Sequence, residues 1–136
     1  MNTKMVIAAG IFSFFALLAA TAFVPSAGDP WVVPEKYKKM KNPVKSDAES
    51  IATGKALYVK HCKSCHGSKG LGDGSKAAQL KTDSGDFSIA GFQSQTDGSL
   101  FYKTNEGRGD MPSFKKKIPD ETDVWSVVNY MRTLKK

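Results

Sequence analysis

The sequence predicts a small all-α domain, on three observations. Two stretches near the ends of residues 46–136 carry the capping and periodicity signals of helices. No stretch shows the alternation of a convincing strand, and no internal repeat is visible. The chain has 136 residues, which leaves room for one domain once the ends are discounted.

The chain begins with a short positive region followed by an apolar run over residues 5–24. This pattern is typical of a secretory signal, and Ala20-Thr21-Ala22 offers a small-x-small cleavage site. The run is also long enough to cross a bilayer as an uncleaved anchor helix. We favour cleavage and treat residues 1–24 as a signal peptide or N-terminal membrane anchor. Both interpretations place the rest of the chain in the periplasm, soluble or tethered to the outer face of the inner membrane.

Residues 25–45 are expected to form an irregular arm rich in proline and lysine. Four of the six prolines lie here, and proline opposes a long helix because it lacks a backbone donor. Two interpretations remain open for this arm. It is a solvated linker, or it packs on the domain through Trp31, Val32 and Tyr37.

A first helix is predicted to begin the domain, which we assign to residues 46–136. Ser46-Asp47-Ala48-Glu49 fits a capping box. Apolar or small residues then recur at helical spacing, namely Ile51, Gly54, Leu57, Tyr58 and Cys62. Glycine in mid-helix costs about 1 kcal/mol relative to alanine. Close approach of another helix would explain why Gly54 is tolerated.

A last helix is predicted after Pro119-Asp120, a start signal. It carries an apolar stripe formed by Val124, Val127, Val128, Met131 and Leu134. Between the two helices lie a Gly-rich loop over 67–74, a polar stretch over 76–95 and a shorter helix expected over 98–105.

The strongest chemical signal is Cys62-Lys63-Ser64-Cys65-His66, because C-x-x-C-H is the attachment sequence for c-type haem. About one helical turn separates the two cysteines, so both sulfurs can reach the vinyl groups of one porphyrin. The adjacent His66 can then project its imidazole to the iron. A covalent haem would also supply core material that the chain lacks once residues 5–24 are discounted.

Three other interpretations of the cysteine pair are weaker. A structural disulfide suits an oxidising compartment. A thioredoxin-type redox pair needs a βαβ context, which is missing here. A zinc site needs dispersed ligands, whereas the cysteines and histidines of this chain all lie within residues 61–66.

Met111 is the favoured second axial ligand. The two histidines are too close in sequence to lie on opposite faces of a haem, and methionine is the remaining soft ligand. Met1 and Met5 belong to the leader, Met40 lies in the arm, and Met131 fits core packing. Met111 instead follows flexible glycines and precedes Pro112, in a loop suited to cover a flat ring. The alternative is an exposed loop methionine that leaves the iron open or water-bound.

The sequence resembles the class I cytochromes c of bacteria, most of all the single-haem domains found as subunits or fused modules of respiratory complexes. The resemblance covers roughly residues 46–136 and is carried by Gly54-x-x-Leu57-Tyr58-x-x-His61-Cys62-x-x-Cys65-His66-Gly67, Leu71-Gly72-Asp73-Gly74, Met111-Pro112-x-Phe114 and Trp125-x-Val127-Val128-x-Tyr130-Met131. It implies a cytochrome c fold whose first and last helices cross over one edge of the haem. Gly54 and Tyr58 would then face Val127 and Tyr130.

One departure from that family concerns His66. Many members have a proline shortly after the haem motif, whose carbonyl orients the imidazole. This chain has none over residues 67–80, so the resemblance names no acceptor for His66.

These features together predict a single-electron carrier with one covalent haem c, its iron held by His66 and Met111, and no enzymatic activity of its own. The net charge of +7 suits redox partners with acidic docking surfaces, and association with a respiratory complex is a further possibility. Scattered lysines without a motif argue against nucleic acid. The candidate docking lysines are Lys60, Lys63, Lys69, Lys76 and residues 115–117. The alternatives are a haem-based catalytic or gas-sensing module with an open distal site, and a structural subunit of a membrane complex.

Overall fold

Helices form the regular elements of residues 30–136, which are the residues that a computed structural model of the chain describes. They are α1 (Glu35–Lys38), α2 (Ala48–His61), α3 (Lys63–His66), the 3-10 helix η1 (Ala77–Gln79), α4 (Ala90–Gln93), α5 (Asp97–Glu106) and α6 (Glu121–Thr133). Within this part of the chain, extended pairing is limited to one isolated bridge between Arg108 and Met111. The all-α prediction is therefore confirmed for the described residues. The leader predicted at 1–24 lies outside them.

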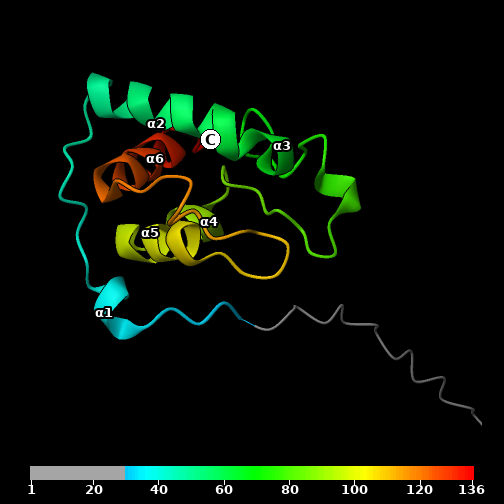
Figure 1. The fold of residues 1–136 in the computed structure, drawn as a ribbon, viewed down its shortest axis with the longest axis horizontal. Coiled ribbons are helices and arrows are strands. Elements are labelled where there is room, and N and C mark those ends of the chain that lie inside the picture. The colour runs from blue at the N-terminus through cyan, green and yellow to red at the C-terminus, as the bar shows by residue number, and fades with distance from the viewer. Residues whose placement is uncertain (1–29) are drawn as a thin grey trace, which may run out of the picture. The chain divides into compact units, whose positions relative to one another are not determined.

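Helices α2 and α6 pack directly on each other, as predicted for the first and last helices of the domain (Figure 1). Gly54 lies at their closest approach, because a Cβ built on it would overlap the backbone carbonyl of Ser126 and lie 3.0 Å from Tyr130 Cβ. The rings of Tyr58 and Tyr130 meet beside this point, with centroids 5.1 Å apart. The absence of a side chain at Gly54 thus permits the crossing of the two helices.

Helix α2 begins one residue later than its sequence suggests. The N-cap is Asp47 and not Ser46, since Asp47 has extended backbone angles and its carboxylate accepts from the Ser50 backbone N–H at 3.0 Å. The Ser50 hydroxyl accepts from the Asp47 N–H in return and donates to the Lys45 carbonyl at 2.7 Å. This second use of Ser50 explains the shift, because a cap at Asp47 places the buried Ser50 hydroxyl where it satisfies two backbone groups.

The arm packs on the domain from Trp31 onward, and Trp31–Lys136 form one compact unit. Tyr37 of α1 lies against Tyr102 of α5 with ring centroids 4.6 Å apart. Val33 is buried, whereas Val32 is 77% exposed. Of the two interpretations left open for the arm, packing on the domain therefore holds, but not through Val32. Consecutive side chains of an extended segment point to opposite sides, and the adjacent Val33 takes the inward position.

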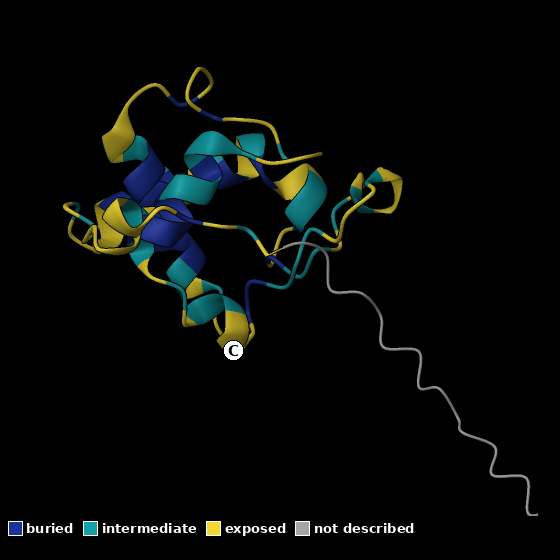
Figure 2. Ribbon diagram, turned by 90° about the horizontal axis from the view of Figure 1, so that it is seen from below, coloured by how far each residue is buried: buried dark blue, intermediate teal, exposed yellow. Residues whose placement is uncertain are grey.

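The core lies between α2, α5 and α6. Phe101 of α5 stacks on Trp125 of α6 at 4.1 Å between ring centroids. Figure 2 shows the buried residues gathered in the helices, with most loops half-buried or exposed. Among the residues described, no helix has both the length and the apolar character needed to cross a membrane.

Candidate cofactor site

A cavity of about 560 Å³ opens beside the end of α2. Its wall contains all four residues singled out from the sequence, Cys62, Cys65, His66 and Met111. These residues come from two segments more than forty positions apart, the α2–α3 junction and the loop after α5. The volume lies in the range of small-molecule and cofactor sites.

The two cysteines lie three residues apart, at the two ends of one tight helical turn. Cys62 ends α2 and begins α3, and its carbonyl accepts from the backbone N–H groups of Cys65 at 3.1 Å and His66 at 3.0 Å. Both cysteines are free thiols, with Cys62 buried and Cys65 half-buried. Burial, followed by the neighbouring Cys65, raises the pKa of the Cys62 thiol to about 12, so this thiol is neutral at pH 7 in the unmodified chain.

His66 has a defined orientation and a defined tautomer. Its Nδ1 lies 2.9 Å from the backbone carbonyl of Ser84, which can only accept, so Nδ1 carries the proton and Nε2 does not. Burial lowers the pKa of His66 and outweighs the opposing hydrogen bond to Ser84, which keeps the imidazole neutral. A neutral imidazole with one fixed nitrogen is the form that ligates metals.

Ser84 is the hydrogen-bond acceptor for His66 that takes the place of the missing proline carbonyl. Its carbonyl is presented by a turn in which the Gly85 N–H donates to the Asp83 carboxylate at 2.8 Å, and Gly85 has a φ of +74°. The Asp-x-Gly pattern over 83–85 was the available signal, because it predicts such a turn. Nothing local in the sequence connects that turn to a histidine 18 residues earlier.

Met111 lies in a short loop closed by its own backbone. Arg108 N–H donates to the Met111 carbonyl at 2.8 Å, and Met111 N–H donates to the Arg108 carbonyl at 3.0 Å. Gly107 and Gly109 flank Arg108 with φ of +69° and +57°, angles that other residues rarely adopt. The half-buried Met111 is thus held at the cavity wall by a turn that its neighbouring glycines allow.

The remaining wall combines apolar and cationic groups. Leu80 and Phe114 supply apolar surface. Four basic residues, Lys60, Lys76, Arg108 and Lys117, outnumber two acidic residues, Asp83 and Asp110. The cavity wall is therefore positive in net charge, with apolar surface at Leu80 and Phe114.

Two buried polar atoms at this wall have no hydrogen-bond partner within the protein, His61 Nε2 and Ser84 Oγ. No local sequence pattern indicates a ligand role for either residue. Burial, followed by Lys60 and Lys117, lowers the pKa of His61. Unpartnered polar atoms at a cavity wall are expected where another group completes the site.

The donor set fits a covalently attached, iron-bearing macrocycle. Two free thiols one helical turn apart, a neutral oriented imidazole and a thioether all face one cavity. The described residues contain no cluster of three or more His, Cys, Asp and Glu side chains that could hold a bare metal ion. Two thiols, an imidazole and a thioether together are the donor set that a covalent haem needs.

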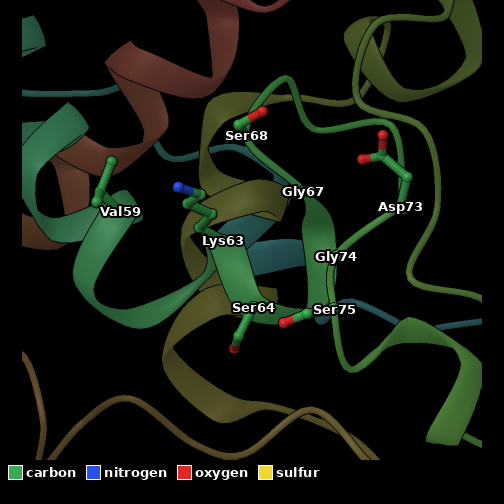
Figure 3. Close-up of a pocket in the computed structure, with 8 residues that line it drawn as sticks. All are labelled: Val59, Lys63, Ser64, Gly67, Ser68, Asp73, Gly74 and Ser75. Atoms are coloured by element: carbon green, nitrogen blue, oxygen red, sulfur yellow. The ribbon is translucent and has the colours of Figure 1, made fainter.

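A second, shallower depression of about 380 Å³ lies beside α3 (Figure 3). It is lined mainly by small polar residues together with Val59, Lys63 and Asp73. It contains neither cysteine, nor His66, nor Met111, so it is separate from the candidate chemistry.

The family model that matches this chain and two of the similar proteins are of cytochrome c type. Residues 49–131 match the family model of cytochrome c oxidase, cbb3-type, subunit III. A cytochrome c6 from Cladophora glomerata is 33% identical over 90 residues, which cover 62% of this chain and 89% of that protein. The solved c-type cytochrome KustC0563 is 32% identical with a TM-score of 0.54, over 61% of this chain and 98% of its own.

A larger solved structure also matches, the Kuenenia stuttgartiensis reducing HAO-like protein complex Kustc0457/Kustc0458. The identity is 25% and the TM-score 0.63, over 69% of this chain. The chain spans about half of that protein, 47% of its length.

Proposed function

The chain belongs to the cytochrome c oxidase, cbb3-type, subunit III family of class I cytochrome c domains, and from this premise we propose that it carries single electrons on one covalent haem c with His66 and Met111 as axial ligands. The observation that supports the proposal most is the shared cavity. Cys62, Cys65, His66 and Met111 line it together although the chain separates them into two segments.

Each residue has a distinct role in the proposed site. The thiols of Cys62 and Cys65 would hold the haem covalently, and Nε2 of His66 and the sulfur of Met111 would bind its iron. The haem, when bound, supplies an iron that changes its oxidation state by one electron. Ser84 fixes the ring of His66, and the thioether of Met111 would favour the ferrous state of a bound haem iron.

Replacing Met111 tests the ligation. Met111→Ala in the mature haem protein should lose the low-spin ferric spectrum and bind CO or cyanide rapidly. Met40→Ala is the matched control, because Met40 lies in the arm, is 36% exposed and does not line the cavity. A Met111→Ala protein with the spectrum and slow CO binding of the parent would refute the ligation. Rapid CO binding by the parent would favour the catalytic or gas-sensing alternative.

The covalent attachment has its own test. A reduced-minus-oxidised spectrum and the intact mass of protein from its native source should report one haem that resists extraction by acidified organic solvent. Cys62→Ala or Cys65→Ala should weaken that resistance. A pigment that leaves the parent protein under these conditions would contradict the proposal.

The cationic groups around the cavity support docking on an acidic redox partner. Lys60, Lys76 and Lys117 are exposed and line the cavity, so their charges would lie close to a haem bound there. Electrostatic docking predicts that the association rate falls as ionic strength rises. A rate that does not change with salt would count against this partner class.

The N-terminal residues bear on where this transfer takes place. We place the domain in the periplasm, with residues 1–24 acting as a cleaved signal peptide or an anchor, residues 25–45 as the arm and 46–136 as the cytochrome domain. The intact mass from the native source distinguishes the two forms of the leader. Retention of the protein in the cytoplasm would contradict both.

A further inference from the structure

Trp31 lines the cavity although it lies outside the stretch that matches the family. The other described residues of the cavity wall all fall between Lys60 and Lys117, within the matched residues 49–131. Trp31 precedes that stretch by 18 positions and reaches the cavity from the arm. The arm thus contributes one side chain to a wall that the cytochrome domain otherwise forms.

Several contacts hold this part of the arm against the domain. Val33, two residues after Trp31, is buried, and Tyr37 packs on Tyr102 of α5. Gly98 of α5 faces the arm, where a Cβ would overlap the Tyr37 carbonyl. Further along, the Asn42 side chain donates to the Trp125 carbonyl at 3.2 Å. These contacts hold the arm that carries Trp31 against the domain.

The Trp31 ring contacts the turn that carries Met111. The Arg108 guanidinium lies 4.9 Å from the ring centroid, and the Lys103 ammonium lies 5.5 Å from it. Arg108 exchanges both of its backbone hydrogen bonds with Met111. A ring that attracts the Arg108 cation therefore acts on the residue paired with Met111, in a turn whose glycines allow other conformations.

We propose that Trp31 is a positioning residue for Met111, holding the Met111 turn at the cavity wall through its ring contact with Arg108. The inference rests on the proposed function, because it takes Met111 as the axial ligand. The arm is then part of the haem site rather than a linker to it.

The affinity of the ferric haem protein for added imidazole tests this inference, because imidazole binds by displacing Met111. Trp31→Ala should bind imidazole about three- to tenfold more tightly, in line with the loss of one cation–π contact. Trp31→Phe keeps an aromatic face and should stay close to the parent. Val32→Ala, at the exposed neighbouring position, should not change the affinity.

A purely structural role predicts a different pattern. Arg132→Lys weakens a contact among α4, α5 and α6 and serves as a control for lowered stability, with unchanged imidazole affinity expected. An unchanged affinity in Trp31→Ala would overturn the inference, as would an equal rise in Arg132→Lys. If Trp31→Ala does not accumulate as haem protein, Trp31→Leu keeps bulk without the ring and should show the same rise.

The Met111→Ala variant separates the proposed ligation by Met111 from the proposed positioning role of Trp31. If Met111→Ala raises imidazole affinity and the Trp31 variants do not, the ligation stands and the inference on Trp31 is wrong. If Met111→Ala binds imidazole like the parent, Met111 is not the displaced ligand and both proposals fail.

Discussion

Replacing Gly54 by alanine should force helices α2 and α6 apart. The added Cβ would overlap the Ser126 carbonyl and lie 3.0 Å from Tyr130 Cβ. Neither obstacle is the flexible end of a side chain, so local rotation cannot relieve the overlap. The helices must separate or slide, which disturbs the Tyr58–Tyr130 contact beside them.

Two opposing effects set the change in unfolding free energy of Gly54→Ala, namely helix propensity and overpacking. Alanine gains about 1 kcal/mol over glycine in a helix interior. Overpacking a close contact costs about 1–3 kcal/mol, and a rigid backbone obstacle places Gly54 near the upper end. The expected net loss is therefore about 2 kcal/mol of unfolding free energy. For a domain of about 100 residues this lowers Tm by about 10 °C.

Thermal and guanidinium unfolding of the mature haem protein would measure this loss. Gly91→Ala is the matched control, since Gly91 is an exposed helical glycine whose added Cβ would meet nothing closer than 4.0 Å. It should be neutral or slightly stabilising, whereas Gly54→Ala should destabilise. A Gly54→Ala protein as stable as the Gly91→Ala control would refute the proposed close packing.

Three further predictions concern polar contacts. Asn129→Ala removes a buried amide that donates to the Ser50 hydroxyl at 3.1 Å. Guanidinium unfolding should show an unfolding free energy lower by about 2 kcal/mol, and a change below experimental error would contradict this prediction. Arg132→Lys removes the two hydrogen bonds from the guanidinium to Asp97, at 2.9 and 2.7 Å, and should lower the unfolding free energy by about 1 kcal/mol in the same assay. A variant as stable as the parent would show that a single ammonium group replaces both hydrogen bonds. Hydrogen bonds from Ser50 hold the pKa of the Asp47 carboxyl below its ordinary value of 3.8, so its stabilising contribution is complete above that pH and is lost as pH falls through the lower folded-state value. The unfolding free energy of Asp47→Asn should therefore change less with pH below pH 3.8 than that of the parent. The same pH dependence in both proteins would show that Asp47 does not contribute in this way.

Much of the helical framework follows from patterns within a few residues. Pro119-Asp120 correctly predicted the start of α6, where the Asp120 side chain accepts from the Thr122 N–H at 2.8 Å. The stretch 98–105 correctly predicted α5 to within a residue at each end. Gly54 in mid-helix correctly indicated a close helix crossing. Capping and spacing are local interactions, so the sequence shows them directly.

Other features depend on contacts between distant segments. The cap of α2 moved to Asp47 because Ser50 bonds both to that residue and to the Lys45 carbonyl, near the buried Asn129 of α6. The inward position of Val33 in place of Val32 depends on how the arm lies on the domain. Neither follows from local pattern, since several neighbouring residues offer similar propensities.

The sequence by itself predicted Cys62, Cys65, His66 and Met111 as the residues that would hold a haem. The first three follow from the spacing of two thiols and a histidine along one helical turn, and Met111 from the unsuitability of the other methionines. Only the tertiary structure decided what surrounds them. It brought the Ser84 carbonyl to His66 and Trp31 to the wall beside Arg108. The physical reason is that the path of a loop or an arm is set by packing against distant elements, and no short stretch of residues records that packing.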